Sequence, residues 1–180
     1  MRGRFIAIVG PSGVGKDSIM QTMAALDPRI VLARRVITRP SDAGGEVFDG
    51  VSVAKFQALK AAEAFALSWE AHGLHYAIPM TVDAHLQDGR DVLANLSRAA
   101  LIRAKDRFER FDVINLTAER DVLCARLAAR GRETAAQIAG RLDRAATRLP
   151  DGIVALHLDN SGPLEQTAQS ALDHLYPVRA

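Results

Sequence analysis

The residues best suited to chemistry form a glycine-rich loop near the N-terminus. The loop follows the apolar segment 5–9, precedes a helix-like segment at 18–26, and reads Gly10-Pro11-Ser12-Gly13-Val14-Gly15-Lys16-Asp17-Ser18. A strand, a glycine-rich loop and a helix form the setting of a phosphate-binding P-loop, whose backbone N–H groups and helix N-terminus surround phosphates. We therefore predict that residues 10–18 bind a nucleotide. Lys16 is predicted to be catalytic, because it can neutralise charge on the phosphate oxygens.

The residue after the lysine departs from the usual P-loop pattern. Ser or Thr is expected there to hold Mg²⁺, whereas this chain has Asp17 and places the hydroxyl one residue later, at Ser18. Asp17 and Ser18 are therefore candidate Mg²⁺ ligands, directly or through a water molecule. The alternative for Asp17 is a carboxylate in the first turn of a helix, where it interacts favourably with the helix dipole.

Composition places the chain among ordinary globular proteins. Of its 180 residues, 48% are apolar and 24% charged, which suits one domain, 1–180, with a full core. The net charge of +2 gives no strong nucleic-acid footprint, and no segment approaches the roughly 20 apolar residues of a membrane span. The single cysteine, Cys124, suits a reducing compartment. We expect a cytoplasmic protein that binds neither nucleic acid nor membrane, and the oligomeric state stays open.

Apolar runs alternate with segments of helical periodicity along the chain. Strands are expected at 5–9, 30–38, 65–69, 74–78, 91–96, 111–116 and 153–158. Helices are expected at 18–26, 53–65, 81–87, 98–107, 118–130, 134–148 and 163–175. Because helices separate most of the strands, we predict an α/β fold with a central, mostly parallel sheet covered on both faces.

The whole chain resembles the guanylate kinase family of P-loop phosphotransferases. The shared residues are the loop itself, Thr38-Arg39-Pro40, Gly45-Glu46, Glu70-Ala71-His72-Gly73 with Tyr76, Arg126 to Gly131, and Arg141-Leu142. The resemblance implies a guanylate-kinase-like, three-layer P-loop NTPase fold. It also implies a small, β-rich, acceptor-binding insertion at about 35–80 and a helical lid at about 125–148 that closes on ATP.

The same resemblance implies roles for individual side chains. Arg39 matches an arginine that grips the phosphate of the acceptor, and Glu70 matches a carboxylate that faces the acceptor. Arg130 and Arg141 match lid positions that stabilise the moving phosphoryl group, so both are expected to be catalytic.

The acceptor region departs from the guanylate kinase pattern. Arg35 stands where that family has a serine that reads guanine, and Asp42 stands where it has a second phosphate-binding arginine. His75 replaces a tyrosine, the tyrosine expected after Gly45-Glu46 is missing, and the acidic residue expected around Ser97, beside Asn95, is replaced. An acceptor with no base but with more phosphate would explain both the lost base-reading pocket and the added cation.

This pattern resembles the ribose 1,5-bisphosphate phosphokinases, relatives of guanylate kinase associated with phosphonate breakdown. Three segments carry the resemblance: the Gly-Lys-Asp-Ser end of the loop, the run 69–76, and the Asn-x-Ser-Arg turn at 95–98. It implies transfer of the γ-phosphoryl group of ATP, with Mg²⁺, to ribose 1,5-bisphosphate, giving 5-phosphoribosyl 1-diphosphate and ADP. The substrate is then expected to contact Arg35, Arg39, Glu70, His75, Tyr76 and Arg98.

Other interpretations of these residues stay open. A guanylate kinase is one alternative, and a non-catalytic guanylate-kinase-like binding module is another, although the intact Lys16 and lid arginines count against the module. Among single residues, Arg35 could belong to a solvated strand end, Arg98 to an exposed helix face, and Trp69 to the core. Asp159-Asn160 lies where relatives line the adenine site, with a plain turn as the alternative.

Overall fold

A five-stranded parallel sheet forms the centre of the computed structural model, which describes residues 2–40, 47–129, 131, 134–144 and 148–177. Its strand order is β2-β7-β1-β8-β9, and every neighbouring pair runs parallel. The strands are β1 (Phe5–Val9), β2 (Ile30–Leu32), β7 (Asp91–Asn95), β8 (Phe111–Thr117) and β9 (Leu156–Asp159). All carboxyl ends therefore meet at one edge of the sheet, and the P-loop follows β1 at this edge.

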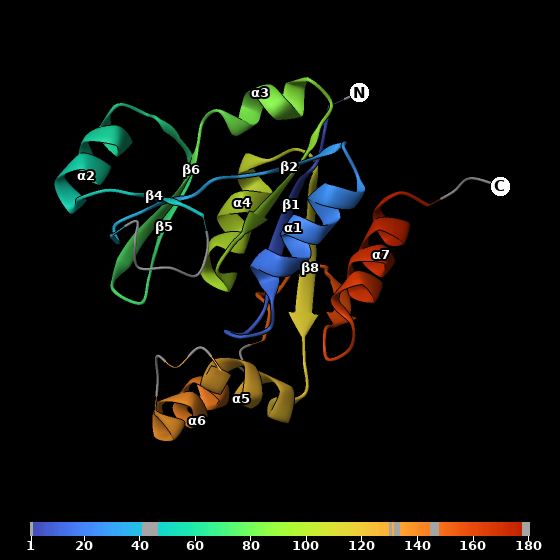
Figure 1. Cartoon of the computed structure of the whole chain (residues 1–180). Helices are drawn as coiled ribbons and strands as arrows, with labels where there is room; N and C mark the ends of the chain where they lie inside the picture. The colour runs from blue at the N-terminus through green and yellow to red at the C-terminus, as the bar shows by residue number, and fades with distance from the viewer. Residues whose placement is uncertain (1, 41–46, 130, 132–133, 145–147, 178–180) are drawn as a thin grey trace.

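Side chains of β1 alternate between two hydrophobic cores, because successive residues of a strand point to opposite faces. Ile6 and Ile8 pack in a core with the helices α1 (Lys16–Leu26), α5 (Arg120–Ala129), α6 (Ala135–Arg144) and α7 (Leu164–Leu175). The alternate β1 residues pack in a second core with α3 (Val82–Gln87) and α4 (Leu101–Arg107). Helices thus cover both faces, and Figure 1 shows α5 and α6 beyond the arrowhead of β8.

A second sheet of four strands, in the order β4-β3-β6-β5, lies beside the central sheet. It is built from β3 (Val36–Ile37), β4 (Asp49–Gly50), β5 (Phe65–Ala71) and β6 (Leu74–Pro79), and α2 (Val53–Ala61) packs on it through Phe56. The β3–β4 pair is parallel and the other two pairs are antiparallel. The predicted turn at His72-Gly73 joins β5 to β6, with φ angles of 53° and 73°. The β-rich insertion is thereby confirmed.

Several expected elements have different limits. The single strand expected at 30–38 is wrong: β2 pairs with β7 in the central sheet, whereas β3 pairs with β4 and β6 in the second sheet. The chain leaves the edge of β7 at Ala33, whose N–H donates to Leu93, and crosses between the sheets. The two-residue strand β4 was not expected.

Some helices differ too. The helix expected at 98–107 begins as a 3-10 turn, η2 (Arg98–Ala100), before α4, and the one expected at 53–65 ends at Ala61. The helix expected at 134–148 spans Ala135–Arg144, and residues 145–147 lie outside the described part. None of the described helices combines the length and the apolar character that crossing a bilayer requires.

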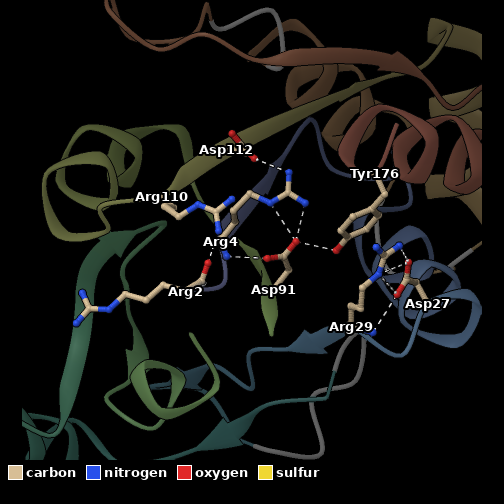
Figure 2. A network of polar contacts seen from close by, with 8 residues as sticks. All are labelled: Arg2, Arg4, Asp27, Arg29, Asp91, Arg110, Asp112 and Tyr176. Atoms are coloured by element: carbon tan, nitrogen blue, oxygen red, sulfur yellow. Dashed lines mark hydrogen bonds and ion pairs between the residues drawn. The ribbon is translucent and has the colours of Figure 1, made fainter. Parts of the chain in front are cut away.

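A network of charged side chains ties the amino ends of the strands together (Figure 2). Asp91, at the start of β7, accepts hydrogen bonds from the backbone N–H of Arg4 at 2.7 Å, from its guanidinium at 2.7 Å and 3.0 Å, and from the Tyr176 hydroxyl at 2.7 Å. Arg4 also contacts Asp112 of β8 at 3.3 Å, and the Arg29 guanidinium lies 3.6 Å from the Tyr176 ring centroid. This network is structural, because the P-loop lies at the opposite ends of the strands.

Candidate active site

The P-loop connects β1 to α1 and adopts backbone angles that favour glycine. Gly15, the N-cap of α1, has a φ of 94°, a left-handed conformation in which a side chain would be strained. A Cβ added there would also lie 2.8 Å from Nδ2 of Asn160. Gly15 therefore places the N-terminus of α1 directly at the loop, where the helix can attract an anion.

Lys16 folds back over the loop. Its Nζ donates hydrogen bonds to the carbonyls of Gly10 at 2.9 Å and Pro11 at 3.0 Å. These contacts hold the ammonium group within the loop that is predicted to bind phosphate. In the first turn of α1, Asp17 is half-buried and Ser18 is exposed, so the hydroxyl lies about 100° round the helix from the carboxylate.

Two side chains from distant elements hold the loop through one carbonyl group. The carbonyl of Val14 accepts a hydrogen bond from Nδ2 of Asn160 at 2.7 Å and from Nη1 of Arg126, in α5, at 3.3 Å. Asn160 is 1% exposed and follows β9. Beside it, the Asp159 carboxylate accepts from the backbone N–H and hydroxyl of Ser161, a local turn that supports the turn interpretation of this segment.

Asn95 joins the P-loop helix to the acceptor region. Its Nδ2 donates to Oδ1 of Asp17 at 3.1 Å, and its backbone carbonyl accepts from Nη1 of Arg35 at 2.9 Å. Arg35 is 7% exposed, and its guanidinium lies 5.3 Å from the Tyr76 ring centroid. Arg35 is therefore a buried cation and not a solvated strand end, whereas its neighbour Arg34 is exposed and pairs with Asp49 at 2.7 Å.

A cavity of about 330 Å³ opens beside Arg35 and Asp17. Its described lining is Asp17, Met20, Gln21, residues 32–35, Val47 and Asn95. The cavity is thus lined by Asp17, the first side chain of the P-loop helix after Lys16, and by Arg35, the cation that marks the departure from the guanylate kinase pattern. Among the described lining residues, Arg35 alone belongs to the predicted substrate set.

The hairpin β5–β6 gathers three more predicted substrate residues. Glu70 and His75 face each other across the strands, with the Glu70 carboxylate 3.1 Å from Nδ1 of His75. Tyr76 stacks on Trp69 with ring centroids 5.4 Å apart, and Trp69 is 5% exposed. The core interpretation of Trp69 is confirmed, and its ring supports the tyrosine that lies near Arg35.

The last two predicted substrate arginines lie in other segments. The Arg39 guanidinium lies 4.4 Å from the Phe48 ring centroid. Arg98 begins η2, three residues after Asn95, and burial lowers the pKa of its guanidinium. Nε of Arg98 and Oγ of Ser97 are buried without a hydrogen-bond partner among the described residues. Unsatisfied buried donors of this kind are suited to a bound anion.

Part of the predicted site falls outside the description. Arg130, Asp42 and the Gly45-Glu46 pair lie outside the described residues, and Arg141 lies in α6. The arginines that follow Arg98 have structural contacts, because Arg103 donates to the carbonyl of Ser68 and Arg107 pairs with Asp83 at 2.5 Å.

Curated relatives match the chain over nearly its full length. The ribose 1,5-bisphosphate phosphokinase PhnN of Ruegeria sp. (strain TM1040) is 53% identical and covers 99% of this chain and 95% of its own. The proteins of the same name from Azotobacter vinelandii and Agrobacterium fabrum are 49% and 45% identical, with at least 94% of each chain covered. This chain belongs to the ribose 1,5-bisphosphate phosphokinase family. No family model matches it.

Solved structures agree on the fold of this kinase. The guanylate kinase from Anaplasma phagocytophilum has a TM-score of 0.68 at 18% identity, covering 97% of this chain and 85% of its own. A gluconokinase from Sinorhizobium meliloti 1021 has a TM-score of 0.55 at 15% identity, covering 97% and 91%. The predicted guanylate-kinase-like α/β fold is confirmed, and membership of a kinase family implies that ATP is used.

Sequence reasoning left three contacts out of the predicted site of this phosphokinase. From the sequence alone, Asn95 stands out only as a departure from the guanylate kinase pattern and as part of a family turn, Arg126 as a lid residue, and Asn160 as a residue near the adenine site. Their hydrogen bonds to Asp17 and Val14 span 78, 112 and 146 residues of sequence. Polar residues at the carboxyl ends of parallel strands, such as Asn95, are the one signal that could have pointed to these contacts.

Proposed function

We propose that the protein transfers the γ-phosphoryl group of ATP to the 1-phosphate of ribose 1,5-bisphosphate. The bond between the γ-phosphorus and the β–γ bridging oxygen breaks, and an oxygen of the 1-phosphate forms the new P–O bond. The products are 5-phospho-α-D-ribosyl 1-diphosphate and ADP. A phosphate oxygen is already nucleophilic at neutral pH, so no general base is needed, and His72, His75 and Glu70 need not remove a proton.

Buried Arg35 is the observation that carries this proposal. A sugar with two phosphates brings about four negative charges at neutral pH. Arg35 lies beside the cavity at the N-terminal end of the P-loop helix, where its guanidinium, which donates from Nη1 to the Asn95 carbonyl, supplies positive charge for a phosphate. The family named after this sugar bisphosphate covers the full chain, which supports the same substrate.

The remaining side chains divide between the donor and the acceptor. The backbone of residues 10–15 and Lys16 hold the phosphates of ATP and stabilise the charge that moves during transfer. Arg39 and Arg98 take up acceptor phosphate, and Glu70, His75 and Tyr76 bind sugar hydroxyls or phosphate from the hairpin. Residues at about 35–80 form the acceptor-binding region, and those at about 125–148 form the lid, from which Arg130 and Arg141 reach the phosphoryl group.

Asp17 and Ser18 are the proposed Mg²⁺ ligands. Carboxylate and hydroxyl oxygens are donors that Mg²⁺ prefers, so these two residues would hold the ion directly or through a water molecule. When bound, the ion neutralises charge on the nucleotide phosphates. We also place the enzyme in the cytoplasm.

ADP release with different acceptors tests the proposed function. Purified enzyme with ATP and Mg²⁺ is given ribose 1,5-bisphosphate, ribose 5-phosphate or GMP in separate assays. We expect kcat/KM for ribose 1,5-bisphosphate to exceed that for GMP by about 100-fold or more, because GMP lacks the second phosphate that Arg35 binds. Efficient turnover of GMP with none of the sugar bisphosphate would contradict the proposal.

A further inference from the structure

Asn95 occupies a central position at the carboxyl edge of the main sheet. It is the last residue of β7, which lies between β2 and β1. The segment after β2 leads to Arg35, and the P-loop after β1 leads to Asp17. Asn95 therefore stands where the acceptor region and the nucleotide-binding loop meet, and it is only 9% exposed.

The two contacts of Asn95 use different parts of the residue. The side-chain amide donates to Oδ1 of Asp17, whereas the backbone carbonyl accepts from Arg35. The amide type matters, because an ionised carboxylate at this position could not donate to Asp17 and would add negative charge beside incoming phosphates. An asparagine supplies the donor without the charge.

We propose that Asn95 is a positioning residue that fixes the Asp17 carboxylate for binding of the metal–nucleotide complex. The proposal rests on the proposed function, since it takes Asp17 as a metal ligand. By donating to Oδ1, the buried amide sets the orientation of the carboxylate and leaves Oδ2 for the metal or one of its waters. Partners of metal ligands typically change metal affinity 10–100-fold when they are removed.

The separation of the two contacts makes the proposal testable. Replacing Asn95 by Ala removes the amide but keeps the backbone carbonyl that accepts from Arg35. Asn95→Ala is therefore expected to raise the Mg²⁺ concentration that gives half-maximal activity and to leave the KM for the sugar acceptor within about twofold of wild type. A general collapse of the site would raise both the Mg²⁺ requirement and the acceptor KM.

Calorimetric binding of ADP, with and without Mg²⁺, measures this effect without turnover. We expect Mg²⁺ to tighten ADP binding by the wild-type protein, and we expect this gain to fall about tenfold in Asn95→Ala while metal-free ADP binding stays unchanged. Asn115→Ala is the matched control, because Asn115 is a buried asparagine, 7% exposed, of strand β8, which lies on the other side of β1 from β7, and its amide contacts His157 at 3.1 Å. Asn115→Ala should keep the full Mg²⁺-dependent gain in ADP affinity. An unchanged gain in Asn95→Ala would overturn the proposal.

A double variant tests whether Asn95 acts through Asp17. Asp17→Asn should lose most of the Mg²⁺-dependent gain, and adding Asn95→Ala should lower it no further. Additive losses would overturn the proposal. If Asn95→Ala does not fold stably, Asn95→Leu, which keeps the branching at Cγ without the donor, gives the same comparison. These measurements contain no ribose 1,5-bisphosphate, so a failure of the proposed reaction would appear only in the acceptor assays.

Discussion

Lys16 is the side chain that we propose to contribute most to the phosphotransfer chemistry. Its ammonium group is already held inside the loop by the carbonyls of Gly10 and Pro11. A charge placed before the reaction stabilises the transition state without the cost of reorganisation. We expect Lys16→Ala to remove on the order of 3 kcal/mol of transition-state stabilisation, which is about a 100-fold loss in kcat/KM for ADP release.

Lys105→Ala is the control for this prediction. Lys105 is exposed on α4 and donates to the carbonyl of Gly152 at 2.9 Å, away from the P-loop. Its removal should leave kcat/KM within about twofold of wild type. A Lys16→Ala enzyme that lost less than about threefold would show that the assigned active site is wrong.

The sequence predicts residues whose partners are close in sequence far better than residues whose partners are distant. The P-loop is one continuous run with its strand and helix on either side, so its function could be predicted from local pattern alone. Asn160 could not be assigned in the same way, because its role depends on Val14, 146 residues earlier. The proposed role of Asn95 likewise depends on a fold that brings the ends of β1 and β7 together.

At the scale of elements, the pattern of apolar residues in the sequence predicts buried strands well, but it does not say which sheet a strand joins. The segments 5–9 and 91–96 are mostly apolar and buried, and the structure places β1 and β7 there. The segment 30–38 has a similar composition, yet it divides between two sheets at the crossing near Ala33. Strand β4 has only two residues and exists through its pairing with β3, so no periodicity could reveal it.

Packing between the P-loop and the β9–α7 connection predicts a specific coupling between two residues. Gly15→Ala should destabilise the protein by about 2 kcal/mol or more, because the φ of 94° strains alanine and the new Cβ contacts Asn160. Asn160→Ala should cost about 1–3 kcal/mol, because a buried hydrogen bond to Val14 is lost. Asn160→Ala also removes the atom that the new Cβ would meet.

Urea unfolding of the two single variants and the double variant measures the coupling. We expect the double variant to be more stable than the sum of the single losses predicts, by about 1 kcal/mol. The comparison pair is Gly15→Ala with Val14→Ala. Val14→Ala forms a cavity in the same loop but keeps the Asn160 amide. Strictly additive losses for Gly15→Ala and Asn160→Ala would show that the contact between the new Cβ and Nδ2 of Asn160 does not contribute to the destabilisation by Gly15→Ala.

At the scale of the whole molecule, the two ends of the central sheet have separate tasks. The carboxyl ends of the strands carry the P-loop, Asn95 and the cavity beside Arg35. The amino ends carry the network around Asp91, which joins β1, β7 and β8 to Tyr176 after α7 (Figure 2). Stability can therefore be changed at one end while the proposed chemistry at the other end is left intact.

This network predicts how stability depends on pH. Burial acts to raise the pKa of Asp91, but hydrogen bonds from Arg4 and Tyr176 outweigh it and lower the pKa below its ordinary value of 3.8. The contribution of Asp91 is therefore present above pH 3.8 and is lost as the pH falls through the lowered value. Burial and the hydrogen bond to Asp91 raise the pKa of Tyr176 above its ordinary value of 10.0. The contribution of Tyr176 is therefore complete below pH 10.0 and is lost as the pH rises toward the raised value.

Tyr176→Phe tests both limits at once, because it removes one hydroxyl that contacts a charged group. Near pH 7 we expect the free energy of unfolding to fall by about 2 kcal/mol, as measured by urea titration. The difference from wild type should shrink as the pH falls from 3.8 through the lowered pKa of Asp91, and again above pH 10.0, where the unfolded wild-type chain loses the Tyr176 proton. Asp112→Asn is the control: Asp112 is 45% exposed and meets Arg4 at 3.3 Å, so its removal should cost less than about 1 kcal/mol. A Tyr176→Phe difference that stayed constant from pH 3 to pH 11 would mean that the hydroxyl acts through packing alone, and not through the charge of Asp91.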